Sequence, residues 1–301
     1  MNQLNVFLFK NLNFVSMRLF IVFFGLITLS GCGKDIPPPT YLSIDEFTLD
    51  PNIDVNFGQL THAFMDVYVY VDGQNFGVFP LPCVIPLNLE GVKELRLMPA
   101  VRANGQSGAK IRYPFVEHHV QLVDFVRLDT VHIQPRTQYY STTQVWYEDF
   151  EDAAIQIEST VLSNVTLTRS NDPSILEARN GNFFGLVQLN ETENFWDART
   201  NADWPLAPNR PAFIEIDFYN TNSFQTGLRS SGNAGLNMIQ HVLIVPQREG
   251  ELRWRKMYID IGALVGRVGV GNTFNLMLSS ILDGGSEGTV AIDNIKLVYR
   301  P

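Results

Sequence analysis

The sequence predicts an all-β protein. Short runs in which apolar and polar residues alternate follow one another along most of the chain, and this period of two is typical of strands. Turn-forming pairs such as Asp72-Gly73 separate the runs. The one helical signal, residues 172–181, fits an irregular strand equally well. Many short strands joined by turns are typical of β-sandwiches.

A leader opens the chain. Residues 19–29 are apolar and follow basic Lys10 and Arg18, which suits a signal peptide and falls short of the roughly 20 residues of a spanning helix. Leu29-Ser30-Gly31-Cys32 resembles the lipobox of bacterial lipoproteins. This resemblance implies a signal peptide over residues 1–31, a lipid on Cys32 and attachment to a membrane. An ordinary secretory signal or a buried apolar helix are the alternatives, and Met17 is a second candidate start.

Residues 32–40 are expected to be the lipidated cysteine and a tether. Pro37-Pro38-Pro39 favours extended polyproline geometry, which makes a semi-rigid spacer. Lys34-Asp35 resembles a shortened form of the acidic export signal that Bacteroidota surface lipoproteins carry after the cysteine. We therefore expect an outer-membrane location, with the cell surface favoured over the periplasmic face.

The roughly 270 residues after the leader exceed the usual size of one domain and predict two. We expect independently folding domains over residues 41–143 and 144–301, with the join between about Tyr139 and Trp146. The first is expected to be a small β-sandwich, whose strands include residues 65–71, 92–97, 120–128 and 130–134. Asp72-Gly73 predicts a hairpin after the first of these strands, and the second is expected to end at Pro99.

Two stretches of the first domain carry a resemblance. Residues 70–80, with Val-Asp-Gly at positions 71–73, Gly77 and Pro80, are followed by Gly91-Val92. The pattern resembles PEGA-type and other immunoglobulin-like bacterial surface domains. The resemblance implies an N-terminal immunoglobulin-like β-sandwich that serves as a spacer or docking module.

The second domain has longer alternating strands. We expect strands at residues 214–218, 252–261, 274–278 and 289–299. In the first of these, apolar side chains alternate with Glu215 and Asp217, so the two carboxylates are expected to face water. In the last, the inward-facing set changes parity between Ile292 and Ile295, which predicts a β-bulge at Asp293-Asn294.

The two ends of this domain carry a second resemblance. Residues 147–152 (Tyr-Glu-Asp-Phe-Glu-Asp) and 292–297 (Ile-Asp-Asn-Ile-Lys-Leu) resemble the ends of carbohydrate-binding-module-type jelly rolls. The same ending is similar to that of uncharacterised Bacteroidota outer-membrane lipoproteins. The resemblance implies a C-terminal jelly-roll β-sandwich that binds a ligand. In such modules a structural Ca²⁺ often lies between the first and last strands, which makes Glu151 and Asp293 the candidate metal ligands. The alternative is a solvated Glu151 and an Asp293 that caps the bulge.

The sequence gives no support for catalysis. Residues 284–288 (Gly-Gly-Ser-Glu-Gly) match the nucleophile elbow in letters, but they lie between two expected strands rather than before a helix. Cys83 has no intramolecular partner once Cys32 is lipidated, and we expect a buried thiol there. The formal net charge of −9 disfavours nucleic-acid partners. We therefore expect no enzymatic activity.

The densest mixture of aromatic and hydrogen-bonding side chains lies at residues 194–205. Its candidate ligand-binding residues are Trp196, Asp197, Arg199, Asp203 and Trp204. Exposed indoles stack on sugar rings and are also frequent hot spots of protein interfaces. The alternative is that both indoles belong to the core.

These observations lead to one functional expectation and one alternative. We expect a non-catalytic, lipid-anchored outer-membrane protein that acts as a binding or scaffolding subunit of an envelope protein complex. The alternative is a glycan-binding surface lipoprotein of a polysaccharide-uptake system. Thr130, in Asp129-Thr130-Val131, resembles the acceptor of Bacteroidota O-glycosylation and is consistent with an exported protein.

Overall fold

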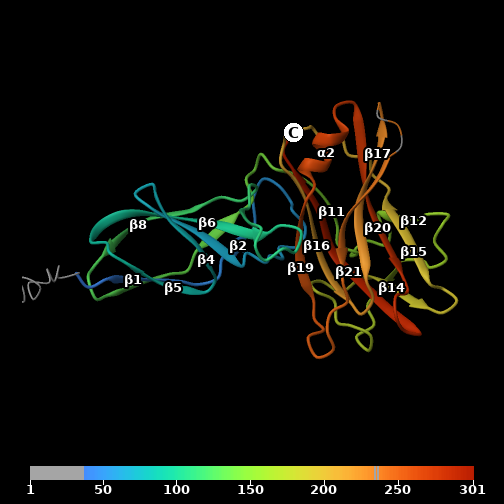
Figure 1. Cartoon of the computed structure of the whole chain (residues 1–301), viewed down its shortest axis with the longest axis horizontal. Coiled ribbons are helices and arrows are strands. Elements are labelled where there is room, and N and C mark those ends of the chain that lie inside the picture. Colours follow the sequence, from blue (N-terminus) through green and yellow to red (C-terminus); the bar gives the residue numbers. More distant parts are fainter. Residues whose placement is uncertain (1–36, 234, 236) are drawn as a thin grey trace, which may run out of the picture. The chain divides into compact units, whose positions relative to one another are not determined.

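The computed structural model describes residues 37–233, 235 and 237–301 and shows an all-β protein (Figure 1). The predicted fold class is confirmed. From Thr40 to Pro301 the chain forms one compact unit. It contains two groups of strands, which we call the first sandwich (residues 40–143) and the second sandwich (residues 144–301). Within the described residues, no helix combines the length and the apolar character needed to cross a bilayer. The leader and Cys32 lie outside these residues.

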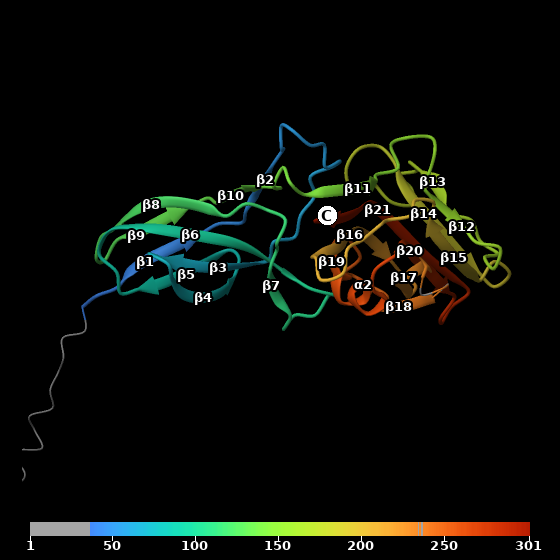
Figure 2. The same ribbon diagram turned by 90° about the horizontal axis from the view of Figure 1, so that it is seen from above.

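The first sandwich is built from short strands. They are β1 (Thr40–Ile44), β2 (Thr48–Asp50), β3 (Asp66–Val71), β4 (Gln74–Pro80), β5 (Cys83–Leu87), β6 (Gly91–Arg102), β7 (Lys110–Arg112), β8 (His119–Phe125), β9 (Thr130–Ile133) and β10 (Arg136–Gln138). They form the sheets β5-β1-β9, β10-β2 and β4-β3-β6-β7, and β8 also pairs with β6 (Figure 2). Apolar side chains from these sheets share one core, including Leu42, Val69, Leu97 and Phe125.

The hairpin predicted in the first sandwich is present, whereas the strand expected to end at Pro99 is longer than predicted. Asp72 and Gly73 both have positive φ and connect β3 to β4, as a tight hairpin turn requires. β6 differs from the expectation, because it continues through Pro99. The carbonyl of Pro99 accepts a hydrogen bond from the N–H of Tyr113, just after β7. The nitrogen of Pro99, which carries no hydrogen, lies on the same side of β6 as this carbonyl. That position falls between the ends of β7 and β8, so the absent N–H interrupts no strand pairing.

The second sandwich has two larger sheets. Its strands are β11 (Gln144–Glu148), β12 (Ile157–Ser159), β13 (Thr168–Ser170), β14 (Phe184–Asn190), β15 (Phe195–Thr200), β16 (Ala212–Asn220), β17 (Phe224–Gly232), β18 (Asn237–Ile244), β19 (Arg255–Asp260), β20 (Asn272–Ile281) and β21 (Glu287–Tyr299). One sheet has the order β13-β14-β21-β16-β19, with β11 also on β21, and the other has the order β12-β15-β20-β17-β18. Helix α2 (Gly262–Val268) packs Leu264 and Val265 into the core.

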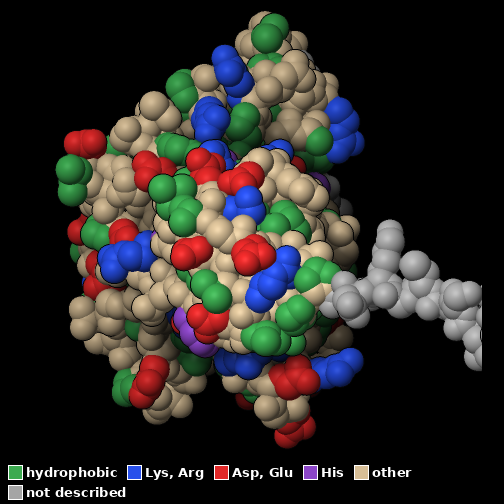
Figure 3. Space-filling view, turned by 90° about the vertical axis from the view of Figure 1, so that its left-hand side faces the viewer, with side chains coloured by type: hydrophobic (Ala, Val, Ile, Leu, Met, Phe, Trp, Pro, Cys, Tyr) green, Lys and Arg blue, Asp and Glu red, His purple; other side chains and the backbone are tan. Residues whose placement is uncertain are grey.

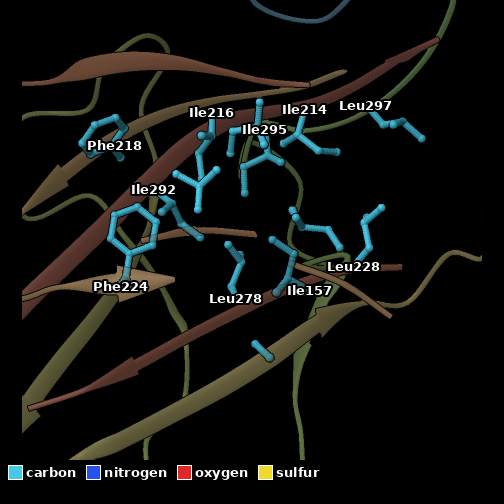
Figure 4. Close-up of a cluster of buried hydrophobic side chains, with 14 of the residues drawn as sticks. Ile157, Ile214, Ile216, Phe218, Phe224, Leu228, Leu278, Ile292, Ile295 and Leu297 are labelled. Carbon is cyan, nitrogen blue, oxygen red and sulfur yellow. The ribbon is translucent and has the colours of Figure 1, made fainter. Parts of the chain in front are cut away.

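The core of the second sandwich lies between these two sheets (Figure 4). Ile214 and Ile216 of β16 and Ile295 of β21 contribute from one sheet, and Leu228 of β17 and Leu278 of β20 contribute from the other. Burying side chains of this size stabilises the fold by about 1.5–3 kcal/mol each. The alternation along the strands thus produces a single apolar layer.

The predicted bulge in the last strand is confirmed. Glu215 pairs with Lys296 and Asp217 pairs with Asp293, so β21 carries one more residue than β16 over this interval. Asn294 has a φ of 47°, which accommodates the extra residue.

Glu215 and Asp217 are not exposed to water, which corrects the expectation from alternation. Both are fully buried, because the face of β16 that points away from the core is covered by residues of the first sandwich. Glu215 Oε1 accepts hydrogen bonds from the hydroxyls of Tyr113, at 2.5 Å, and Tyr139, at 2.7 Å. The hydroxyl of Thr61 donates to Asp217 Oδ2 at 2.5 Å. A strand pattern alone does not reveal a second covered face.

Two lysines balance these carboxylates. Lys256 Nζ lies 3.2 Å from Glu215 Oε2 and 3.6 Å from Asp217 Oδ2, and Lys296 Nζ donates to the carbonyl of Gln59. We call Glu215, Asp217, Lys256 and Lys296 the buried charge cluster. Burial would raise the pKa of Glu215, but the two lysines and the tyrosine hydroxyls outweigh it and hold that pKa below its usual value. Burial lowers the pKa of Lys296 to about 8, against the attraction of Glu215.

The buried charge cluster lies where the two sandwiches meet, and apolar side chains pack around it. Phe213, Tyr258 and Val298 of the second sandwich pack into the core of the first. β11 begins at Gln144, within the region where the join between domains was expected. Independent folding of the two domains stays a prediction.

Candidate functional site

The face of the β12-β15-β20-β17-β18 sheet that points away from the core carries the candidate site. Alternation along each strand determines which side chains point to this outer face and which point to the core. In β15, Trp196 and Ala198 lie in the core, whereas Asp197 and Arg199 face outward. In β20, Met277 holds an outward position. This face is therefore built by the same period of two that builds the core.

A groove of about 680 Å³ crosses this face. Four aliphatic side chains that line it are more than half exposed: Leu162 (65%), Met238 (57%), Leu243 (60%) and Ile281 (62%). We call this part the aliphatic section. Large exposed apolar side chains gathered around one depression mark a contact surface, and methionine adapts its shape to what it contacts.

The groove continues along the sheet. A second part, of about 450 Å³, shares Leu162, Asp197, Met238 and Met277 with the aliphatic section. It also reaches Arg199. Because the two parts share four lining residues, we treat them as one outer groove.

The far end of the outer groove is polar. This polar section, of about 160 Å³, is lined by Glu158, Arg199, Asp203, Arg229 and Asn275 among others. Arg199 donates from Nε and Nη2 to Glu158 Oε1, at 2.9 and 2.7 Å. Asn275 Nδ2 donates to Asp203 Oδ1 at 2.8 Å. The section therefore offers both charges and oriented hydrogen-bonding groups.

Asp197 lies where the aliphatic and polar halves of the groove meet. Its side chain is largely buried, and Oδ2 accepts a hydrogen bond from the hydroxyl of Thr160 at 2.5 Å. The backbone N–H of Asp197 donates to Ser163 Oγ at 3.2 Å. These bonds hold the carboxylate in place at the floor of the groove.

The two tryptophans of the 194–205 segment do not reach the groove. Trp196 is fully buried and Trp204 is 4% exposed. The ring of Trp204 packs on that of Trp146, with 5.2 Å between centroids. The expected exposure of Trp196 and Trp204 is therefore wrong, and the alternative, that both indoles belong to the core, is correct. Asp197 and Arg199 do line the groove, and Asp203 lines its polar section, so ligand binding by these three stays a prediction.

Most of the aliphatic lining was not foreseen from the sequence. Met277 and Ile281 occupy alternate positions in β20, so their outward direction follows from the strand pattern. Leu162 lies in a loop, and Met238 and Leu243 belong to a strand at the far edge of the sheet. Only the folded sheet brings these residues together, and no local pattern indicates it.

Glu151 and Asp293, the candidate calcium ligands, are held by protein groups. Glu151 Oε1 accepts hydrogen bonds from the N–H groups of Asn182, at 2.7 Å, and Phe183, at 3.0 Å. Asp293 Oδ1 accepts one from the N–H of Asn294 at 2.7 Å, as a cap of the bulge does. In the described part of the chain, no group of three or more His, Cys, Asp or Glu side chains is placed to hold a metal ion. A calcium site stays a prediction.

Two further residues singled out in the sequence lie in the first sandwich. Thr130 is exposed at the start of β9, and its glycosylation stays a prediction. Cys83 is half-buried, and burial raises the pKa of its thiol. A raised pKa lowers the thiolate fraction and hence the reactivity of the sulfur.

Comparisons with known proteins give structural matches only. No family model matches the chain, and no curated protein sequence matches it. A carbohydrate-binding module described as specific for non-crystalline cellulose is 12% identical, with a TM-score of 0.37, over 49% of this chain and 91% of the module. A family 11 module from a Clostridium thermocellum cellulase is 12% identical, with a TM-score of 0.36, over 51% of this chain and 94% of the module. A family 61 module in complex with β-1,4-galactotriose is 12% identical, with a TM-score of 0.31, over 48% and 87%. The likeness concerns the β-sandwich architecture alone.

Proposed function

We propose that this protein is a non-catalytic binding protein of the outer membrane, and that its outer groove holds an aliphatic segment of a protein partner. The observation that carries the proposal is the aliphatic section, where Leu162, Met238, Leu243 and Ile281 surround one depression while more than half exposed. Covering such side chains releases about 25 cal/mol for each Å² of apolar surface, which is the main driving force of association.

The shape of the surface fits an extended peptide. β18 forms one edge of the sheet, and it carries Met238 and Leu243 toward the groove. An edge strand presents unpaired backbone groups, to which a partner strand adds while its alternate side chains enter the apolar depression. The polar section then gives direction, because Arg199 and Glu158 recognise charged groups at one end only.

A glycan is the second candidate, and the polar section favours it. Asp203, Asn275 and the Arg199–Glu158 pair present the donors and acceptors that sugar hydroxyls require. The aliphatic section fits a sugar less well. Among the described lining residues of that section, the aromatic rings are Phe195, which is half-buried, and Phe224, which is 1% exposed. Phe195 shares the outward-facing side of β15 with Asp197, so among these described residues it is the one partly exposed ring available for stacking.

Membrane attachment is the second part of the proposal, and the lipobox-like Leu29-Ser30-Gly31-Cys32 supports it. Acyl chains on Cys32 would hold the protein at the outer membrane, since each buried CH₂ contributes about 0.8 kcal/mol. A tether of residues 33–39 would hold the protein at the membrane surface through Cys32. The protein would then present its groove to partners in the same envelope.

Site-specific crosslinking in living cells tests the groove. A photoreactive amino acid in place of Met238 should yield one discrete adduct with another protein. The same amino acid in place of Leu122, which is 73% exposed on β8 of the first sandwich, is the matched control. Adducts of equal yield from both positions would contradict the proposal. An absent adduct, together with retention by a soluble polysaccharide that Arg199→Ala abolishes, would favour the glycan.

A further inference from the structure

A second group of exposed aliphatic side chains lies at one end of the first sandwich. Val92 is 66% exposed, Val126 is 50% exposed and Leu128 is 74% exposed. Val92 is the second residue of β6, where it pairs with Asp124 of β8, and the other two lie in the turn that follows β8. We call Val92, Val126 and Leu128 the aliphatic tip. Figure 3 views this end of the molecule and shows hydrophobic side chains exposed between charged ones.

The aliphatic tip is hydrogen-bonded to the residue at which the first sandwich begins. The hydroxyl oxygen of Thr40 lies 3.0 Å from the carbonyl oxygens of both Val126 and Leu89, which share its one hydrogen as acceptors. The N–H of Tyr41 donates to the carbonyl of Asp129 at 2.9 Å. The chain therefore enters the first sandwich directly beside the tip.

The turn holds Leu128 outward. Leu128 has a φ of 65°, which is uncommon for a residue with a bulky side chain, and the N–H of Asp129 closes the turn on the carbonyl of Val126 at 3.1 Å. Strained positions of this kind concentrate at functional sites. Arg127, between the two apolar residues, donates from Nε to Glu90 Oε2 at 2.8 Å, so that its charge is compensated on the protein.

The distance to the proposed lipid is short. Eight residue steps lead from Cys32 to Thr40, and they span at most about 29 Å when fully extended. Thr40 would thus lie within that distance of the lipidated cysteine, with the tip directly beside Thr40. Of the exposed apolar groups in the described chain, this one is bonded to the residue where the tether ends.

We propose that the aliphatic tip is a membrane-contacting surface that inserts Val92, Val126 and Leu128 between lipid headgroups. The proposal rests on the proposed attachment through Cys32, which confines the tip to the bilayer surface. Three aliphatic side chains bind a bilayer weakly by themselves, but confinement makes the contact intramolecular and raises its effective concentration. Acidic Asp124 and Asp129 lie beside the tip, so the expected surface is zwitterionic rather than anionic.

The test places an indole at the tip and brominated lipid in the bilayer. The mature chain, residues 32–301, carrying Cys83→Ser is coupled through the Cys32 thiol to maleimide lipid in phosphatidylcholine vesicles. Coupling by this route replaces the natural acylation. Bromines on the acyl chains quench an indole that enters the bilayer. The variants are Leu128→Trp and, as the matched control, Leu162→Trp in the second sandwich, which is 65% exposed.

We expect brominated lipid to quench the Leu128→Trp indole several-fold more than the Leu162→Trp indole, after subtraction of the parent protein. Adding Val126→Asp to Leu128→Trp should abolish the difference. Equal quenching of the two indoles, with the protein coupled and folded, would overturn the proposal. Acylation is tested separately, by alkyne-fatty-acid labelling of the wild type and of Cys32→Ala in cells. If the wild type is not labelled, or if Cys32→Ala is labelled equally, natural acylation at Cys32 is refuted. The quenching experiment tests only the contact between the tip and the bilayer.

Discussion

The bulge in β21 buries an acid that should make stability depend on pH. Asp293 is fully buried, and its Oδ1 accepts a hydrogen bond from the N–H of Asn294. Burial, with the repulsion of Asp217 added, raises the pKa of Asp293 from 3.8 to about 8. The folded protein therefore carries a neutral carboxyl at this position at pH 7.

The sign and size of the effect follow from proton linkage. Between pH 4 and pH 8 the folded state holds a proton that the unfolded state has released, so the free energy of unfolding falls as pH rises through this window. The slope is at most about 1.4 kcal/mol per pH unit. Between pH 5 and pH 7 the contribution of Asp293 should fall by up to about 2.7 kcal/mol.

Asp293→Asn tests this reasoning, because the amide has the shape of the neutral carboxyl and no proton to lose. We expect the stability of the variant relative to wild type to increase from pH 5 to pH 7, as measured by urea unfolding at each pH. Other titrating groups act on both proteins and largely cancel in the difference. The control is Asp124→Asn, which makes the same substitution at an exposed acid of β8. A pH-independent difference for Asp293→Asn would refute the argument.

Three further predictions concern stability. Trp196→Ala should lower the free energy of unfolding by about 3–5 kcal/mol, because the indole is fully buried, and a loss within about 0.5 kcal/mol in denaturant unfolding would contradict that burial. Lys256→Met should cost about 3–5 kcal/mol, since it leaves Glu215 and Asp217 buried without their nearest cation, whereas Lys93→Met at an exposed ion pair should cost less than about 1 kcal/mol. Equal losses in the two lysine variants would show that the cluster is solvated. The calcium site predicted at Glu151 and Asp293 should make the melting temperature several degrees higher in millimolar calcium than in chelator, because a ligand that binds only the folded state stabilises it. Identical melts would contradict the site and leave Asp293 as a cap of the bulge.

Local patterns predicted most of the strands, because turn chemistry and side-chain alternation depend only on residues that are close together in the sequence. The hairpin at Asp72-Gly73 and the bulge at Asp293-Asn294 both follow from short-range rules of turn chemistry and parity. Helix α2 was missed, since only seven residues form it and no acidic residue lies in its first turn to signal its start. Residues 172–181 form a turn and irregular backbone rather than a helix or a strand.

These short-range rules could not predict features that depend on contacts between segments far apart in the sequence. Alternation marks Glu215 as pointing away from its own core, but it does not show that Tyr113 and Tyr139, far away in sequence, cover that face. In the same way, the polar neighbours of Trp196 suggested an exposed ring, whereas alternation along β15 turns those neighbours outward and the ring inward. The aliphatic section of the groove combines a loop with two strands and has no local signature.

The central claim is that the aliphatic section of the outer groove binds a protein partner. The most direct measurement is the affinity of wild-type and Met238→Asp protein for the partner identified by crosslinking at position 238, with Leu122→Asp as the control. A carboxylate at position 238 would be desolvated against Leu162 and Met277, so we expect Met238→Asp to weaken binding at least tenfold, about 1.4 kcal/mol or more, while its melting temperature stays near that of wild type. Unchanged affinity in a folded Met238→Asp protein would contradict the account.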